Sequence, residues 1–325
     1  MKKLYWIFAI IFLFFIGDRL GGYLLKQMVS NSQFRYSKMY RGEADCDILF
    51  LGNSRGLGFY QPYIEEVTGK KTFNLSYNAL PMNLGRVLLE DYLANNNKPE
   101  LIIVDITMMN RVDTTLVTGF NVYTPYSEGL GEVVKSHSKN VFYGGKLSHL
   151  FLHNSEIFQR AMFYYSKSDE DWIVDRVINE NMVNAVDEQK PFYAGPFDWS
   201  TEGMMFDELN KMVKIAKENN IKIKLVVSPF FPPFVDKIVN FEHLQKRVKM
   251  ATSDDFQTSP FFPPFVNRVV KKDSLQHIIT TATGMEFYNY ADAVQDPTGF
   301  GDYQHVNIKG AKQYIDKMKA DGIFD

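Results

Sequence analysis

Two short segments at opposite ends of the chain carry residue types that together can perform acyl transfer. Near the start, Ser54 follows a hydrophobic run and stands in a turn between Gly52 and Gly56. Near the end, Asp302 stands three residues before His305. A serine hydroxyl becomes a nucleophile when an imidazole removes its proton, and a carboxylate holds that imidazole in one tautomer. These residues therefore predict the nucleophile, base and orienting acid of a serine enzyme.

Neither segment is specific by itself, but their combination is informative. A Gly-Asn-Ser-Arg tetrapeptide is common in loops, Asp302 can simply cap a turn, and a lone histidine is more often structural than catalytic. A serine after the first strand, combined with Asp-x-x-His before the last helix, is much less expected by chance. The flanking glycines would let the backbone approach a carbonyl and turn the Ser54 N–H toward the oxyanion.

Hydrophobic periodicity predicts the elements that position these residues. The expected strands are residues 47–51, 71–75, 101–106, 221–227 and 285–288. The expected helices are residues 61–68, 82–95, 201–219 and 308–319. Alternation of helices with continuously apolar strands predicts a parallel sheet covered on both faces. The carboxyl end of such a strand is where an open α/β sheet places its active site, and Ser54 occupies that position.

The N-terminal segment predicts a membrane anchor. Two lysines precede an apolar run over residues 4–16, which is typical of a signal peptide or a signal anchor. Residues 4–25 reach the about 20 residues of a spanning helix only if Asp18 and Arg19 lie near the outer interface. No small-x-small cleavage site follows, which favours an uncleaved anchor over residues 1–28 rather than a cleaved signal.

The remaining chain, residues 29–325, is expected to form one main domain outside the membrane, in the periplasm or at the cell surface. It is long enough to bury a large core. Residues 110–200 interrupt the strand–helix alternation with glycine and aromatic clusters, and we expect this insert to set substrate specificity. The octapeptide Ser-Pro-Phe-Phe-Pro-Pro-Phe-Val occurs twice, and further matches indicate a tandem duplication of residues 228–258 onto 259–289.

The first copy of the octapeptide follows an expected strand. Phe230 and Phe231 would then lie near the site as an aromatic rim that binds substrate, although packing of a loop explains them at least as well. Aromatic residues make up 15% of the chain, which either a sugar-binding cleft or core packing accounts for. The formal net charge of −2 gives no electrostatic basis for binding nucleic acid. Cys46 is the single cysteine, so no internal disulfide can form.

The two chemistry-bearing segments resemble blocks of the SGNH (GDSL-like) hydrolases. Asp47-Ile-Leu-Phe-Leu-Gly-Asn-Ser54-Arg resembles the nucleophile block in a Gly-x-Ser-Arg form, and Asp302-Tyr-Gln-His305-Val-Asn resembles the acid–base block. The resemblance covers roughly residues 45–319. It is closest to a membrane-anchored bacterial branch similar to alginate O-acetylation proteins and D-alanyl-transfer proteins. It implies a three-layer α/β/α sandwich with a mainly parallel, flavodoxin-like sheet.

The resemblance also indicates which groups would bind the oxyanion besides the serine N–H. Residues 73–79 resemble the second block, in which the family usually has a glycine, and Asn78 or Ala79 stands near that position. The third block, usually Gly-x-Asn-Asp, is not recognisable, so Thr107 and Asn110 are the candidates for the missing donor. Loss of one such donor costs about a hundredfold or more in rate.

By this resemblance the chain hydrolyses an acyl ester or transfers an acyl group, typically acetyl, onto cell-surface polysaccharide without a cofactor. Arg55 would bind an anionic sugar or form a salt bridge on the following helix. His149 and His153 are four residues apart, but no third metal ligand is evident and we expect no metal site.

Three functions remain open on the sequence. The first is an active membrane-anchored esterase or O-acyltransferase, which the intact serine, aspartate and histidine favour. The second is a catalytically weakened SGNH domain that binds polysaccharide or partners a membrane-bound acyl-transfer protein, which the missing third block favours. The third is a lipid-directed esterase in which the phenylalanine-rich loops contact acyl chains.

Overall fold

The computed structural model of the chain divides into two compact units. The helical unit comprises Met1–Asp45, Val87–Asn97 and Val112–Glu170. The sheet unit comprises Cys46–Arg86, Lys98–Arg111 and Asp171–Asp325. The chain thus passes repeatedly between the two units. The structure describes residues 2–110, 114–168, 176–178, 197–198, 204–235, 238–239, 241–253 and 284–325.

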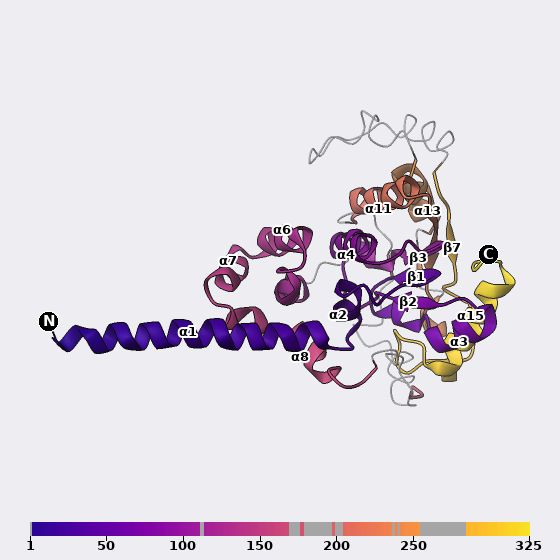
Figure 1. Cartoon of the computed structure of the whole chain (residues 1–325). Helices are drawn as coiled ribbons and strands as arrows, with labels where there is room; N and C mark the ends of the chain where they lie inside the picture. Colours follow the sequence, from indigo (N-terminus) through magenta and orange to yellow (C-terminus); the bar gives the residue numbers. More distant parts are fainter. Residues whose placement is uncertain are drawn as a thin grey trace. The chain divides into compact units, whose positions relative to one another are not determined.

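A five-stranded parallel sheet forms the sheet unit's centre (Figure 1), which confirms the predicted α/β class. Its strands are β1 (Ile48–Leu51), β2 (Thr72–Asn74), β3 (Leu101–Asp105), β5 (Lys222–Val227) and β7 (Phe287–Asn289). They lie in the order β2-β1-β3-β5-β7. This is the doubly wound order found in flavodoxin, which reverses its direction between β1 and β3 and binds ligands at that point.

The strands form where the sequence is apolar over several consecutive residues. All of Ile48–Leu51 is buried, and so is all of Leu101–Asp105. Strands buried on both faces show continuous rather than alternating hydrophobicity, and this pattern made their positions predictable. Strand β7 begins two residues later than the sequence predicts, and its residues are more exposed.

Helices and short helical turns accompany the sheet. The helices are α3 (Gln61–Thr68), α4 (Met82–Asn95, shared between the units), α11 (Phe206–Glu218), α12 (Pro232–Val235), α13 (Phe241–Ala251) and α15 (Ile308–Ala320). The 3₁₀ turns are η1 (Ser54–Gly58), η2 (Ile106–Asn110) and η5 (Pro297–Gly299). A second, two-stranded parallel sheet pairs β4 (Phe197–Asp198) with β6 (Ile238–Val239).

Helix α15 illustrates why these segments are helical. Asn307 caps its first turn by accepting a hydrogen bond from the Gly310 N–H at 3.1 Å. The helix buries one stripe at the spacing i, i+3, i+4, i+7, namely Ala311, Tyr314, Ile315 and Met318. This stripe packs into the same core cluster as residues of β1 and β3.

The first copy of the repeated sequence contains α12, β6 and α13. The second copy lies outside the described residues except for its last part, residues 284–289. The predicted equivalence of the two copies as structural units therefore also lies outside the described residues.

Residues 114–168, the longest described stretch of the expected insert, are mostly helical. With the N-terminal segment they form α1 (Lys2–Asn31), α2 (Arg35–Tyr40), α5 (Thr114–Gly119), η3 (Phe120–Tyr123), α6 (Glu128–His137), α7 (Lys139–Leu147), η4 (Leu150–His153) and α8 (Glu156–Phe163). Ser127, Ser138 and Ser155 each cap the next helix by accepting an N–H bond three residues on. These serines are the local signal for the helices.

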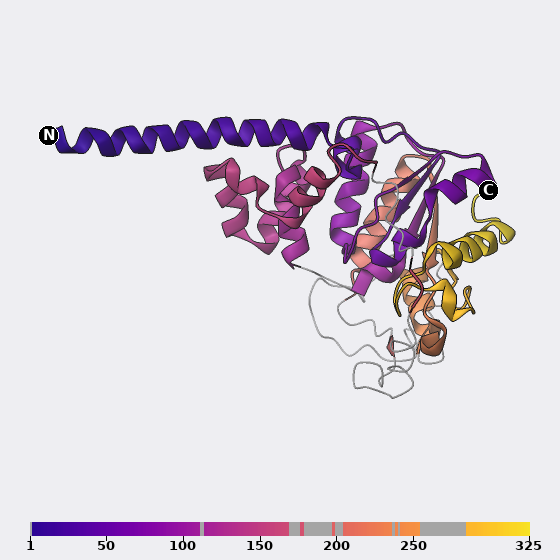
Figure 2. The same ribbon diagram turned by 90° about the horizontal axis from the view of Figure 1, so that it is seen from below.

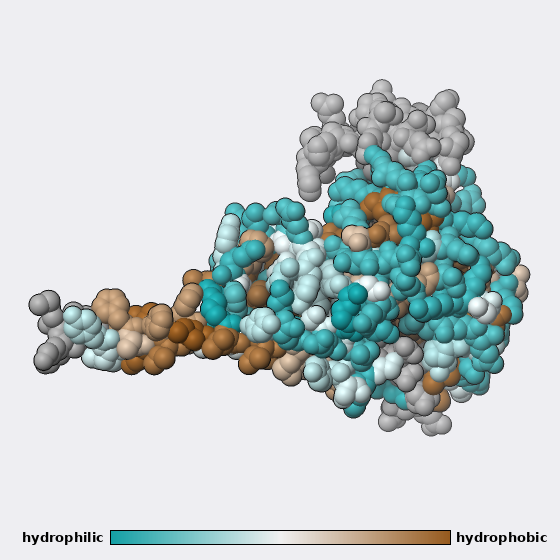
Figure 3. Space-filling view, viewed as in Figure 1, coloured by the Kyte–Doolittle hydropathy of each residue, from teal (hydrophilic) through white to brown (hydrophobic). Residues whose placement is uncertain are grey.

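Helix α1 is long and apolar enough over Tyr5–Asn31 to span a membrane. Its first half extends beyond the other helices of the helical unit (Figures 1 and 2). The large apolar residues on this half are exposed, and they form a hydrophobic surface along the helix (Figure 3). A helix that is long and apolar enough to span a membrane is therefore present where the sequence predicts an anchor.

Asp18 and Arg19, two charged residues within the apolar sequence of α1, hold the insert against this helix. The Asp18 carboxylate is buried and accepts hydrogen bonds from the Ser148 hydroxyl and from the N–H groups of His149 and Leu150. Arg19 pairs with Asp18 at 3.2 Å and donates to the Leu147 carbonyl at 3.1 Å. Both charges are therefore used inside the helical unit.

Candidate active site

Ser54 begins the short turn η1 directly after β1, at the point where the strand order reverses. Asn53 caps this turn, because its side-chain oxygen accepts the Arg55 N–H at 2.9 Å. Ser54 itself is half-buried, and its N–H makes no hydrogen bond to a described residue. The predicted nucleophile thus lies at the carboxyl edge of the sheet, and its backbone N–H has no acceptor among the described residues.

Close packing explains why glycine flanks this turn on both sides. A Cβ atom at Gly56 would lie 2.4 Å from the Ser76 hydroxyl, and one at Gly52 would lie 3.0 Å from the Asp105 Cβ. Neither contact leaves room for a larger residue. Glycine is therefore needed at both positions because Ser76, just after β2, and Asp105, at the end of β3, pack directly against the turn.

Asn74, the last residue of β2, fixes the turn from one side. Its side-chain N–H₂ donates to the Gly56 carbonyl at 2.9 Å, and its side-chain oxygen accepts the Ser76 N–H at 2.9 Å. Asn74 is buried, so these hydrogen bonds are shielded from water. The sequence analysis did not assign Asn74, although a polar residue at the end of a buried strand was a usable signal.

Thr107 and Asp105 support the turn from the β3 side. The Thr107 hydroxyl donates to the Asn53 side-chain oxygen at 3.2 Å, and the Thr107 N–H donates to Asp105 at 2.9 Å. Burial raises the pKa of Asp105, while the Thr107 N–H bond and the charge of Arg55 oppose this shift. The hydroxyl of Thr107, one of the expected oxyanion donors, is thus directed at the cap of the serine turn.

The other expected oxyanion residues follow β2 and β3. Asn78 is exposed, and Ala79 has a φ of 56°, the left-handed conformation that glycine adopts most easily. The Tyr77 N–H donates to the Gly52 carbonyl at 3.2 Å, which places this segment beside the serine turn. Asn110 ends η2, and its side chain lies outside the described part of the structure.

Asp302 and His305 form the predicted acid–base pair. The His305 Nδ1 lies 2.8 Å from the Asp302 Oδ1, which also accepts the N–H groups of Gln304 and His305. Burial alone raises the pKa of Asp302, but the hydrogen bond and charge of His305, together with Gln304 and Arg176, lower it to about 2. The carboxylate therefore stays ionised and holds the Nδ1–H tautomer of the imidazole.

Two further residues hold this loop. Arg176 donates to Asp302 at 3.1 Å and to the Gly301 carbonyl at 3.0 Å. Asn307 donates to the carbonyl of Thr298 at 2.8 Å and to that of Arg176 at 3.1 Å. The sequence analysis missed both. Arg176 carries no sequence signal, because it lies far from Asp302 along the chain.

The serine turn and the histidine loop are neighbours in the fold. A Cβ atom at Gly58, the last residue of η1, would lie 2.7 Å from a methyl of Val306. No hydrogen bond joins Ser54 to His305, and the buried His305 Nε2 has no hydrogen-bond partner among the described residues. The structure thus brings the three predicted catalytic residues to one region, but the serine–histidine hydrogen bond is not formed. In free enzymes such bonds are often long and tighten when substrate binds.

Arg55 does not form the salt bridge that the sequence analysis considered on the following helix, because no ion pair joins it to a described residue. It donates instead to the Pro229 carbonyl at 3.0 Å, and its guanidinium lies 3.7 Å from the Phe230 ring centroid. Burial lowers the pKa of Arg55 to about 10, against the opposing charges of Asp105 and Asp302. Arg55 therefore remains a cation beside the site.

Phe230 and Phe231, the expected aromatic rim, are both buried. Phe230 supports Arg55, and the Phe231 ring lies 5.4 Å from that of Phe300 in the core. Their packing role is therefore visible, and direct contact with substrate stays a prediction.

No group of three or more histidine, cysteine, aspartate or glutamate residues in the described ranges is placed to hold a metal ion. The His153 Nδ1 bonds the His149 carbonyl at 3.0 Å, and burial lowers the pKa of His153. Both histidines belong to the helical unit.

No family model matches the chain, and no curated protein matches it.

Proposed function

We propose that the protein is a membrane-anchored serine esterase or O-acyltransferase of the SGNH type. Its expected three-layer α/β/α domain would lie outside the cytoplasm of a bacterium and act on acyl groups, typically acetyl, of cell-surface polysaccharide. The observation that carries the proposal is the hydrogen bond between the Asp302 carboxylate and His305, beside the turn that contains Ser54. The Asp302 carboxylate orients the His305 imidazole, and a serine nucleophile requires such an imidazole to remove its hydroxyl proton.

Ser54 and His305 could together carry out a two-step acyl transfer. Ser54 Oγ attacks the acyl carbonyl while His305 Nε2, which has no hydrogen-bond partner among the described residues, takes the hydroxyl proton. The bond from the acyl carbon to the leaving oxygen then breaks, and that oxygen receives the proton from His305. Water or a sugar hydroxyl next attacks the acyl carbon and gives its proton to His305. His305 passes this proton to Ser54 Oγ as the bond between Oγ and the acyl carbon breaks.

Two backbone donors remain available for the oxyanion. The N–H groups of Ser54 and Ala79 make no hydrogen bond to a described residue. The left-handed conformation of Ala79 supports assigning it, rather than Asn78, to the position where the SGNH family usually has glycine. Arg55 supplies a positive charge beside the site, which favours an anionic sugar as acceptor or ester.

The test uses the full chain in a neutral detergent. Wild type is expected to hydrolyse p-nitrophenyl acetate and to react with a fluorophosphonate, whereas Ser54→Ala and His305→Ala lose both reactions. Ser136→Ala, which changes an exposed serine of α6, is the matched control and is expected to behave as wild type. Equal inertness of wild type and Ser54→Ala toward acetyl esters would defeat the proposal. Rates that rise with acyl chain length would favour a lipid-directed esterase.

A second candidate function rests on two observations. No hydrogen bond joins Ser54 to His305, and the Thr107 hydroxyl donates to Asn53 and is therefore not available to an oxyanion. A catalytically weakened domain of this kind would bind polysaccharide or a membrane-bound acyl-transfer partner. Polysaccharide binding that is retained in a wild type without esterase activity would support it.

A further inference from the structure

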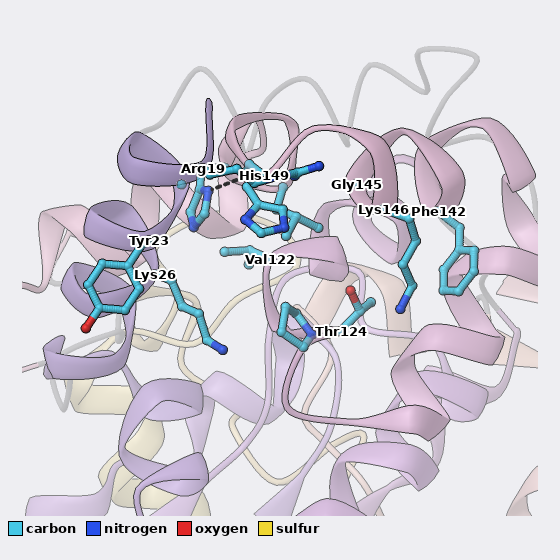
Figure 4. A pocket seen from close by; sticks show the side chains of 13 residues that line it. Arg19, Tyr23, Lys26, Val122, Thr124, Phe142, Gly145, Lys146 and His149 are labelled. Carbon is cyan, nitrogen blue, oxygen red and sulfur yellow. Dashed lines mark hydrogen bonds between the residues drawn. The ribbon is translucent and has the colours of Figure 1, made fainter. Parts of the chain in front are cut away.

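The helical unit encloses a cavity of ≈ 500 Å³ between α1 and the insert (Figure 4). Helix α1 contributes Arg19, Gly22, Tyr23 and Lys26, whose spacing i, i+3, i+4, i+7 places them on one helix face. A Cβ atom at Gly22 would lie 2.2 Å from the His149 Cβ, so the insert approaches α1 closely there. The cavity is therefore built by the packing of the insert on the spanning helix.

The lining carries positive charge and no described acidic side chain. Arg19 is paired with Asp18, but neither Lys26 nor Lys146 forms an ion pair with a described residue. Lys26 lies 5.1 Å from the Tyr126 ring centroid, and Lys146 lies 5.3 Å from that of Phe142. Figure 4 shows the two lysine side chains approaching Thr124 from opposite sides. Two ammonium groups without an ion-pair partner among the described residues thus share one cavity, while the Thr124 hydroxyl between them donates to the Asn121 carbonyl at 2.8 Å.

The same stretch of α1 is apolar on its other side. Leu20 is 61% exposed and Leu24 is 62% exposed, although they lie between Arg19 and Lys26 in sequence. Arg19 and Lys26 are about 10 Å apart along the helix axis at 1.5 Å per residue. Leu147, whose carbonyl accepts the Arg19 bond, is 79% exposed. Apolar residues that face outward at the level of unpaired cations are typical of the boundary between lipid chains and head groups.

We propose that this cavity binds the phosphate-bearing head group of an anionic membrane amphiphile, with Lys26 and Lys146 as the phosphate contacts. The apolar lining, which includes Val122, Pro125 and Leu152, takes the first part of the hydrophobic tail. The site does not depend on the chemistry of Ser54. It gives the insert a binding function at the membrane surface, separate from the proposed active site in the sheet unit.

The experiment measures lipid binding to the full chain in nanodiscs and in neutral detergent by native mass spectrometry. Phosphatidylglycerol is expected to bind at least tenfold more tightly than phosphatidylcholine. The double variant Lys26→Gln/Lys146→Gln is expected to lose this preference. Lys139→Gln/Lys167→Gln removes the same charge from exposed positions outside the cavity and is expected to keep it.

A further variant keeps the test decisive if the glutamine substitutions unfold the unit. Lys26→Arg/Lys146→Arg preserves the charge and is expected to retain the lipid preference with a near-wild-type melting temperature. If Lys26→Gln/Lys146→Gln and Lys139→Gln/Lys167→Gln lose the phosphatidylglycerol preference equally, the proposal is overturned, because the preference would then reflect the overall charge of the protein. Binding of glycerol phosphate or inorganic phosphate as tight as that of the lipid would also overturn it, since the tail would contribute nothing.

Discussion

The guanidinium of Arg55 lies over the ring of Phe230, with 3.7 Å between the guanidinium carbon and the ring centroid. The Pro229 carbonyl accepts one of its N–H groups, so the residue directly before Phe230 also holds it. The loop after β5 thereby fixes a cation beside the turn that carries Ser54. No described carboxylate neutralises this cation by direct contact.

We expect Phe230→Leu to weaken the binding of acyl esters that carry a carboxylate. A cation–π contact contributes about 0.5 to 2 kcal/mol, so the KM for an anionic ester should rise about 2- to 30-fold with little change in kcat. The neutral ester p-nitrophenyl acetate serves as the internal control. An equal rise in KM for both esters would show that Arg55 only packs the loop.

The Asp302–His305 pair predicts a specific pH dependence of stability. The folded-state pKa of Asp302 is about 2, below the ordinary value near 3.9. The ionised carboxylate therefore contributes fully to folding stability above about pH 4, and this contribution is lost as the pH falls toward 2. Thermal unfolding between pH 2 and 6 should therefore show a smaller acid destabilisation in Asp302→Asn than in wild type. Overlapping pH profiles would contradict the shift.

The same variant should be nearly inactive at neutral pH. An asparagine cannot hold the Nδ1–H tautomer as a carboxylate does, and kcat should fall by about 10²- to 10⁴-fold. Steady-state kinetics at pH 7 measure this loss. Asp296→Asn, which alters an exposed carboxylate of the neighbouring η5 turn, is the control and should leave kcat within about twofold.

Thr107→Val distinguishes a support of the serine turn from an oxyanion donor. If its hydroxyl only bonds Asn53, the loss of this hydrogen bond should cost about 1 kcal/mol of unfolding free energy and less than about tenfold in kcat. An oxyanion donor would instead cost about a hundredfold or more. We expect the smaller loss, measured by urea unfolding together with ester hydrolysis.

The left-handed conformation of Ala79 predicts that Ala79→Gly is tolerated and that Ala79→Val is not. A β-branched residue at positive φ is strained by about 1 to 2 kcal/mol, whereas glycine adopts this conformation freely. Urea unfolding of the two variants measures the difference. Equal stability of the glycine and valine variants would be inconsistent with the assigned turn.

Asp18→Ala should loosen the insert from α1. The substitution leaves the Ser148 hydroxyl and the N–H groups of His149 and Leu150 without their acceptor, at a cost of about 1 to 3 kcal/mol for each group that stays buried. Hydrogen exchange of residues 147–153 should become faster. Asp18→Asn keeps an acceptor oxygen and should show a smaller effect, and unchanged exchange in Asp18→Ala would disprove the docking role.

The parallel sheet was predictable because its strands are buried on both faces and therefore read as continuous apolar runs, as in Ile48–Leu51. The local Asp302–His305 pair was also predictable, since three residues separate its members and the chain only has to turn. The helices of the insert were not predicted. Their apolar residues are scattered, and the capping serines at 127, 138 and 155 were the signal that was overlooked.

Residues that support the site from a distance could not be predicted in the same way. Arg176 reaches Asp302 across more than a hundred positions of sequence, and no periodicity reports such a contact. Burial of Phe231 in the core likewise depends on Phe300, which the chain brings to it only after folding. Long-range packing decides these positions.

The docking of the insert onto Asp18 makes the N-terminal helix part of the folded helical unit, in addition to its proposed role as a membrane anchor. A protease that shed the protein by cutting after residue 31 would remove the acceptor of the groups at Ser148–Leu150 and one wall of the lysine cavity. The released chain would expose the insert surface that α1 had covered. If α1 anchors the protein as proposed, release from the membrane would therefore disrupt the helical unit rather than free an intact soluble form.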